Sequence, residues 1–269
     1  MPTQVDTTQQ TAPSVSDVVE ILNADGAGSV VLVCEHASNR IPARYGTLGL
    51  SPEARASHIA WDPGAREVAL RLMEILDAPL IAGRVSRLVY DCNRPPDSPA
   101  ASPERSERFD VPGNRDLSET QRHDRRRCIY EPFRARVEAV IKERLARGSI
   151  TALVTIHSFT PIYNGVSRPV EIGVIHDADT RLTDANLAEA SKFPHRRIER
   201  NAPYSKADGV THSLRLYGEE NDLPNAMIEI RNDLLIEATS RDEVSQEIGT
   251  LVQNALDHLG LATVERAHG

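Results

Sequence analysis

Short runs of aliphatic residues alternate with longer amphipathic stretches along most of this chain of 269 residues. β-branched and aliphatic residues dominate four short runs, as is typical of buried strands, at residues 29–34, 151–156, 170–175 and 226–231. Apolar residues recur at helical spacing in four longer stretches, at residues 65–76, 118–147, 179–192 and 241–259. Ser118 and Gly148 are suitable caps for the second of these helices. Alternating strands and helices predict an α/β three-layer sandwich, with a mostly parallel central sheet and helices on both faces.

Other parts of the chain have a less regular pattern. Residues 15–22 are compatible with a short helix or a lead-in segment, and residues 79–82 and 87–90 with a strand pair or one bent strand. Residues 95–116 hold several prolines and charges and predict a long loop, and loops of that length are usually lids or mobile segments. We expect a disordered tail at residues 1–14 and a single α/β domain at residues 15–263.

Composition narrows the classes of partner. The formal net charge is −8 without a long basic block, which argues against nucleic acid as a partner. No apolar run approaches the roughly 18 residues of a membrane span, and the first 28 residues lack the apolar core of a secretory signal. Three widely spaced cysteines form neither a metal knuckle nor a disulfide framework. We therefore expect a cytoplasmic protein that binds no membrane, with its oligomeric state left open.

Two histidines stand at the ends of strand-like runs. His36 closes the run at residues 29–34, and His157 follows the run at residues 151–156. Open α/β sheets bind ligands at the carboxyl ends of their strands. Imidazole is a common zinc ligand, and a catalytic zinc site keeps one position open for water. A single histidine in such a place is often only hydrogen-bonded in a loop, but two of them predict one shared zinc ion.

The sequence offers more than one candidate for the third metal ligand. Asp62 precedes the predicted helix at residues 65–76, where it could equally be an N-cap. Glu35 would point to the opposite face of a regular strand from His36. Asn39 stands where HxxE-type zinc sites have a glutamate, and a neutral amide is a poor zinc ligand. We rank Asp62 first and Glu35 second.

Glu229 and Arg231 lie two residues apart in a predicted strand, so their side chains share one face. If buried together, they would form a structural ion pair. At a sheet edge, Glu229 could instead take a proton from water while Arg231 holds an oxyanion or a carboxylate.

A polar cluster at residues 87–94 suggests a carboxylate-binding site, because arginine side chains recognise carboxylates through two parallel hydrogen bonds. The alternative is a surface patch of ion pairs. Three polar residues that follow His157 could line the same cleft, namely Asn164, Arg168 and Glu171. The candidate substrate-binding residues are Arg87, Asp91, Asn93, Arg94, Asn164 and Arg168.

Five segments together resemble the N-formylglutamate amidohydrolase (N-formylglutamate deformylase) family. They run in order across about residues 30–235: CEHASNRIP at 34–42, WDPGA at 61–65, SRLVYDCNRP at 86–95, IHSFTP at 156–161 and RPVEIGV at 168–174. The resemblance implies an α/β fold like that of zinc exopeptidases (phosphorylase/hydrolase-like). The IEIR segment at residues 228–231 resembles a zinc-carboxypeptidase pattern whose glutamate is the base, which supports Glu229. Asp62 is similar in placement to the acidic ligand of zinc-dependent cell-wall amidases, whereas Asn39 departs from HxxE.

The resemblance therefore implies a metal-dependent hydrolase of linear amides that contains one Zn²⁺ per chain and serves amino-acid catabolism. His36, His157 and Asp62 would hold the metal, and Glu229 would activate water. The substrate would be a small anionic N-formyl or N-acyl amino acid such as N-formylglutamate. The alternatives are a related zinc amidase or peptidase acting on another N-acyl or N-formimidoyl amino acid, and a non-catalytic small-molecule binding protein on the same fold.

Overall fold

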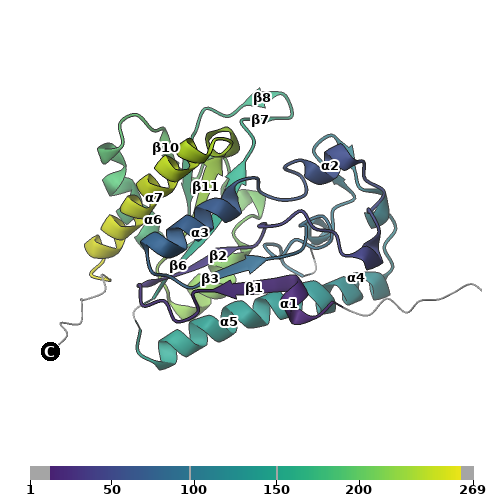
Figure 1. Cartoon of the computed structure of the whole chain (residues 1–269), viewed down its shortest axis with the longest axis horizontal. Coiled ribbons are helices and arrows are strands. Elements are labelled where there is room, and N and C mark those ends of the chain that lie inside the picture. The colour runs from purple at the N-terminus through teal and green to yellow at the C-terminus, as the bar shows by residue number, and fades with distance from the viewer. Residues whose placement is uncertain (1–12, 97, 150, 262–269) are drawn as a thin grey trace, which may run out of the picture.

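A sheet of seven strands forms the centre of the structure, a computed structural model that describes residues 13–96, 98–149 and 151–261 (Figure 1). In sheet order the strands are β1 (Val19–Leu22), β3 (Leu80–Gly83), β2 (Val30–Cys34), β6 (Ala152–Phe159), β11 (Asn225–Arg231), β9 (Ile172–Ile175) and β10 (Ile198–Arg200). β1 runs antiparallel to β3 and β9 antiparallel to β11, while the other neighbours are parallel. The mostly parallel α/β sheet expected from the sequence is confirmed.

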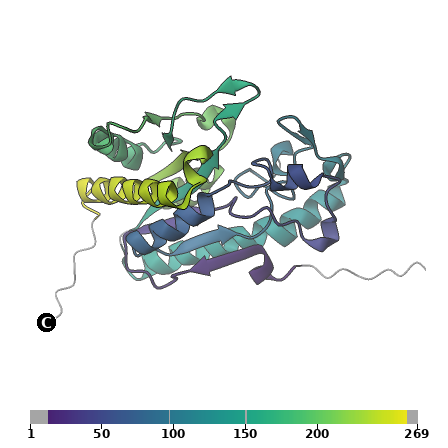
Figure 2. The same ribbon diagram turned by 45° about the horizontal axis from the view of Figure 1, so that its top comes forward.

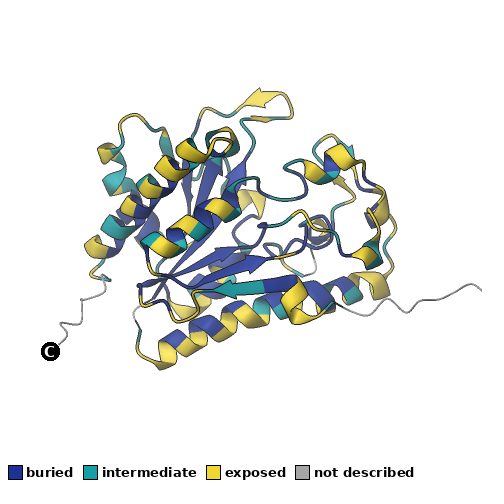
Figure 3. Ribbon diagram, in the orientation of Figure 1, coloured by how far each residue is buried: buried dark blue, intermediate teal, exposed yellow. Residues whose placement is uncertain are grey.

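Helices cover both faces of this sheet, as the rotated view shows (Figure 2). On one face lie α3 (Ala65–Ile75), α6 (Arg181–Glu189) and α7 (Ala238–His258). On the other lies α5 (Glu131–Ala146), and two shorter helices, α1 (Val15–Val18) and α2 (Pro52–Ala56), lie at the periphery. The central strands are buried except for Arg231 at the end of β11, whereas the outer helix faces are exposed (Figure 3). Burial on both faces explains why these strands are continuous aliphatic runs rather than alternating ones.

Three expected elements differ from the structure. Residues 118–147 form two helices, α4 (Glu119–Arg125) and α5, joined by a π-helical turn at Arg126–Tyr130, and Ser118 caps the first as predicted. Residues 15–22 divide into α1 and the edge strand β1. Residues 87–90 form a turn rather than a strand, because the Ser86 hydroxyl accepts the Leu88 N–H and the Ser86 carbonyl accepts the Val89 N–H.

The loop at residues 95–116 is tied to the domain. It contains a short hairpin, β4 (Arg105–Ser106) and β5 (Phe109–Asp110). Its buried Asn114 donates to the Leu88 carbonyl and accepts from Arg125. Residues 1–12 of the expected tail, and residues 262–263 at the end of the expected domain, lie outside the described residues. Within the described part of the chain, no helix has the length and apolar character that a membrane span requires.

Candidate metal centre and active site

His36, Asp62 and His157 meet at one edge of the sheet. His36 lies two residues beyond β2, and Asp62 lies just before α3. The Asp62 N–H donates to the His36 carbonyl at 3.0 Å, which ties these two segments together. His157 lies inside β6, which continues to Phe159, rather than after the strand as expected. The three residues are at most 3% exposed.

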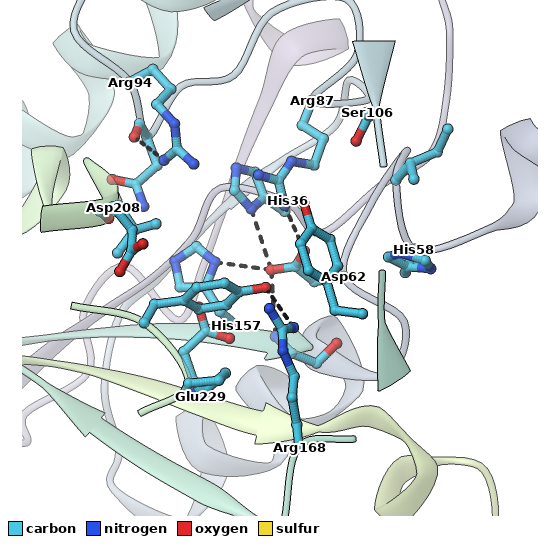
Figure 4. A pocket seen from close by; sticks show the side chains of 17 residues that line it. His36, His58, Asp62, Arg87, Arg94, Ser106, His157, Arg168, Asp208 and Glu229 are labelled. Atoms are coloured by element: carbon cyan, nitrogen blue, oxygen red, sulfur yellow. Dashed lines mark hydrogen bonds and ion pairs between the residues drawn. The ribbon is translucent and has the colours of Figure 1, made fainter. Parts of the chain in front are cut away.

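The Nδ1 atoms of both imidazoles face the same carboxylate oxygen of Asp62. Asp62 Oδ2 lies 3.3 Å from His36 Nδ1 and 2.9 Å from His157 Nδ1 (Figure 4). A tetrahedral zinc ion with bonds of about 2.0–2.1 Å would hold its donor atoms about 3.3 Å apart. Because one donor atom from each residue lies within 4.8 Å of the others, the group can hold a metal ion.

The second nitrogen of each ring faces a different carboxylate. His36 Nε2 lies 2.7 Å from Asp91 Oδ1, and His157 Nε2 lies 3.2 Å from Glu35 Oε2. Glu35 reaches His157 because β2 ends at Cys34, so the alternation of a regular strand no longer applies to it.

Negative charge is concentrated around these rings. Four carboxylates are at most 5% exposed: Glu35, Asp62, Asp91 and Glu229. Burial alone would raise the pKa of Asp62, but the two histidines and Arg87 hold it well below its usual range. Burial alone would lower the pKa of His157, but Glu35 and Asp62 hold it well above its usual range. Buried carboxylates require positive partners, so the cluster favours either protonated imidazoles or a bound cation.

Glu229 lies beside this cluster. It pairs in register with His157 on the neighbouring parallel strand, so both side chains point to the same face. Burial raises the pKa of Glu229 to about 7. Among the described residues, its buried Oε2 has no hydrogen-bond partner. The carboxylate is therefore placed to exchange a proton near neutral pH with a molecule in the adjoining cavity.

A cavity of about 360 Å³ opens over His36, Asp62, His157 and Glu229. Arg94 and Arg168 also line it and lie on either side of the histidine pair in Figure 4. Within the described ranges, no carboxylate lies closer than 4.0 Å to either guanidinium, the nearest being Asp91 at 4.0 Å from Arg94 Nε. Both cations are thus available to an anionic ligand.

Aromatic rings hold Arg168 in place. Its guanidinium carbon lies 4.5 Å from the ring centre of Tyr163 and 4.7 Å from that of Tyr204. Its Nη1 donates to the Tyr204 hydroxyl at 2.9 Å. Because that oxygen accepts from Arg168, the hydroxyl hydrogen of Tyr204 can be donated to another group. Burial raises the pKa of Tyr204 to about 12, so the hydroxyl stays protonated at neutral pH.

Tyr204 was not among the site residues expected from the sequence. A signal was present in Gly173, which stands inside the aliphatic run at residues 170–175. A Cβ at Gly173 would lie 1.8 Å from the Ala202 carbonyl oxygen. A glycine inside a strand marks a close backbone approach. Here the approaching segment is the one that carries Tyr204 to the cavity wall.

Three candidate substrate-binding residues are engaged in other contacts. Arg87 lines the cavity, but its Nη1 lies 3.3 Å from Asp62 Oδ1 and its Nη2 lies 3.1 Å from Asp91 Oδ2. Asp91 is held by this contact and by His36. Asn93 donates to the Val210 carbonyl and accepts from the Ser213 N–H. All three side chains therefore support the residues around the cavity.

Arg231 and Asn164 are not among the described residues that line the cavity. Arg231 Nε donates to Asp233 at 2.8 Å, and its Nη1 donates to the Pro169 carbonyl at 3.2 Å. Asn164 lies at the turn between the short strands β7 (Ile162–Tyr163) and β8 (Val166–Ser167), and its N–H donates to Glu107 at 3.3 Å. The latter contact joins this hairpin to the loop at residues 95–116. Neither residue shares the expected cleft.

Comparison with known proteins agrees with this fold. The sequence profile of the N-formylglutamate amidohydrolase family matches residues 28–236. The crystal structure of gene product Atu2144 from Agrobacterium tumefaciens is similar, with 50% sequence identity and a TM-score of 0.89 over 91% of this chain and 97% of that one. The structure of N-formylglutamate amidohydrolase from Ralstonia eutropha JMP134 shares the fold, with 18% identity and a TM-score of 0.62 over 91% and 98% of the two chains. No functionally curated protein matches the chain.

Proposed function

The chain belongs to the N-formylglutamate amidohydrolase family, and from that premise we propose that it is a zinc-dependent hydrolase of N-formyl or other N-acyl amino acids. The observation that supports this most directly is the approach of both Nδ1 atoms to the single oxygen Asp62 Oδ2, with Glu229 beside them. The three buried cysteines are free thiols, which is compatible with a cytoplasmic location.

In this proposal, His36, His157 and Asp62 hold one zinc ion per chain. Two histidines and one carboxylate form a common catalytic zinc set, which leaves a position for water. The charge also fits. With both imidazoles neutral, the only positive groups that the described residues set against the four buried carboxylates are Arg87 and the more distant Arg94. A divalent cation would balance the remaining negative charge. When bound, zinc lowers the pKa of water and polarises a carbonyl group.

Glu229 is the proton carrier of the proposed reaction. Its carboxylate takes the proton of the attacking water and later gives it to the leaving amine nitrogen. The carbon–nitrogen bond of the amide breaks, a carbon–oxygen bond forms, and the products are formate (or another carboxylate) and the free amino acid. A cation nearby favours the charged carboxylate, so we expect metal binding to lower the pKa of Glu229.

Arg94 and Arg168 are the proposed carboxylate-binding residues. Each lines the cavity without a carboxylate closer than 4.0 Å in the described structure. Two such cations suit a substrate with two carboxylates, such as N-formylglutamate. The Tyr204 hydroxyl adds a neutral hydrogen-bond donor next to Arg168. We assign Arg87, Asp91 and Asn93 to bracing the site, and Arg231 to holding the backbone beside Arg168.

The test is to measure the zinc content of the purified protein and the release of formate from N-formylglutamate. We expect about one zinc per chain, formate release that a chelator abolishes, and recovery of activity when zinc is restored. N-acetylglutamate and N-formimidoylglutamate, assayed in parallel, identify the acyl group. A protein that binds no zinc and cleaves none of these amides would contradict the proposal and favour a binding role.

A further inference from the structure

We propose that Asp91 and Glu35 are positioning residues, one for each histidine, and that they fix the imidazoles in the tautomer that presents Nδ1 to the metal. This inference rests on the proposed metal site and assigns to it two carboxylates that do not bind the ion.

The contact between Asp91 and His36 is short and braced. Asp91 Oδ1 lies 2.7 Å from His36 Nε2 and also accepts the Asn93 N–H at 2.9 Å. Asp91 Oδ2 accepts from Arg87 Nη2 at 3.1 Å. The carboxylate is 3% exposed. With both oxygens engaged in this way, Asp91 has a fixed orientation, and it in turn orients the ring of His36.

The contact between Glu35 and His157 is looser. Glu35 Oε2 lies 3.2 Å from His157 Nε2, and the Glu35 side chain is fully buried. Ser213 is its other polar neighbour. In the described structure, neither contact has the alignment of a complete hydrogen bond. A buried carboxylate with so few partners is strongly stabilised by a hydrogen bond from a neighbouring N–H group. The Nε2–H tautomer of His157 provides that donor.

Only one nitrogen of each ring can serve a shared cation. The two nitrogens of an imidazole point away from each other. The Nδ1 atoms of both rings approach Asp62 Oδ2, while their Nε2 atoms face two separate carboxylates. A hydrogen on Nε2, donated to a carboxylate, leaves the Nδ1 lone pair free for the metal. Glu35 therefore lies on the side of His157 away from Asp62, which suits a positioning residue better than a ligand.

Arg87 connects this arrangement to the third ligand. Its Nη1 lies 3.3 Å from Asp62 Oδ1, and its Nη2 lies 3.1 Å from Asp91 Oδ2. The Arg87 guanidinium thus orients Asp62, a proposed metal ligand. It also orients Asp91, which in turn orients the ligand His36. Asp62 Oδ2 is left to face the two Nδ1 atoms.

The first experiment uses the unaltered protein loaded with zinc and labelled with ¹⁵N-histidine. For both His36 and His157, we expect NMR shifts of a protonated Nε2 and a metal-bound Nδ1. Protonation at Nδ1 of either ring would overturn the inference, and this result depends on neither catalysis nor the folding of a variant.

The second experiment compares Asp91→Asn and Glu35→Gln with Asp257→Asn. Asp257 is an exposed residue of α7 and is not among the described residues that line the cavity, so it is a matched control. We expect each positioning variant to raise the zinc dissociation constant about 10- to 100-fold in competition with a chelator. Each variant should also shift the ¹⁵N signals of its own histidine more than those of the other, whereas Asp257→Asn should change neither quantity.

The outcomes separate the two proposals. Wild-type protein that binds no zinc would overturn the proposed function and this inference with it. Wild-type protein that binds zinc, with unchanged affinity and histidine signals in both folded variants, would overturn only the positioning role. Restored affinity in Asp91→Glu, relative to Asp91→Asn, would support a specific carboxylate contact.

Discussion

Glu229 and His157 occupy paired positions on the parallel strands β11 and β6. Side chains at paired positions on neighbouring strands point to the same face. The sheet register therefore sets a buried carboxylate directly beside a buried imidazole, and both side chains reach the same cavity. This placement depends on regular backbone hydrogen bonding, so the relative position of the two groups is rigid.

Replacing Glu229 with Gln tests its role as proton carrier. We expect kcat to fall about 10²- to 10⁴-fold, the usual contribution of general acid–base catalysis, while zinc stays bound. Steady-state kinetics and metal analysis measure the two quantities. Glu243→Gln, on the exposed surface of α7, serves as the control. Turnover near the wild-type rate, or loss of zinc from Glu229→Gln, would speak against the role.

The stability of the metal-free protein should fall as the pH rises above about 6.5. Burial and Arg87 act to lower the pKa of His36, but Asp91 and Asp62 raise it above its ordinary value, and the pKa of His157 is raised further. A group whose pKa is raised in the folded state stabilises that state at pH values below its ordinary pKa. This stabilisation is lost as the pH rises through the folded-state pKa.

Thermal unfolding between pH 6 and 9, with a chelator and with zinc, measures this effect. Zinc should restore stability at the higher pH values, because neutral imidazoles bind the metal and no longer repel it. A metal-free melting temperature that is flat or rises across this range would contradict the expectation.

Replacing Arg168 with Lys tests carboxylate recognition. Lysine keeps the charge but loses the planar group that stacks on Tyr163 and Tyr204 and donates to the Tyr204 hydroxyl. Losing a hydrogen bond to a charged group costs about 1.5–3 kcal/mol. We therefore expect KM for N-formylglutamate to rise about 10- to 100-fold, with a smaller change in kcat.

Arg197→Lys, on an exposed arginine, is the control for this substitution. Assays with a substrate that lacks one carboxylate, such as N-formylglutamine, show whether Arg168 reads the side-chain carboxylate. If Arg168→Lys raises KM by the same factor for both substrates, Arg168 does not bind the side-chain carboxylate.

Replacing Gly173 with Ala tests whether the backbone approach holds Tyr204 in place. The new Cβ would lie 1.8 Å from the Ala202 carbonyl oxygen, so the segment leading to Tyr204 must shift. We expect a loss of stability of about 1–3 kcal/mol, as for overpacked cores, together with a higher KM.

Gly209→Ala is the control, because it distinguishes the steric clash at Gly173 from the backbone strain that replacing a glycine can cause. Gly209 has φ +66° and open space around its missing Cβ, so that substitution carries only backbone strain. Chemical denaturation and KM measurements compare the two variants. A Gly173→Ala protein as stable and as active as the wild type would show that the segment does not depend on the close approach.

The sequence alone determined the secondary structure of the core and the main chemical groups. Aliphatic runs and helical periodicity are local properties, and they identified the central strands and α3, α6 and α7. The same local patterns indicated His36, Asp62, His157 and Glu229, because polar residues at the ends of strands and helices are conspicuous against apolar runs.

Tertiary structure decided which of these groups touch. His157 and Asp62 are 95 residues apart in the chain, and their contact depends on how β6 pairs with β2 and where α3 begins. The two-residue spacing from Glu229 favoured Arg231 as a site residue. In the structure its side chain donates to Asp233 and does not line the cavity. Glu35 reaches His157 because the chain leaves strand β2 after Cys34. Tyr204 reaches the cavity because the segment that carries it packs closely against Gly173. Long-range packing fixes such contacts, and no local pattern encodes them.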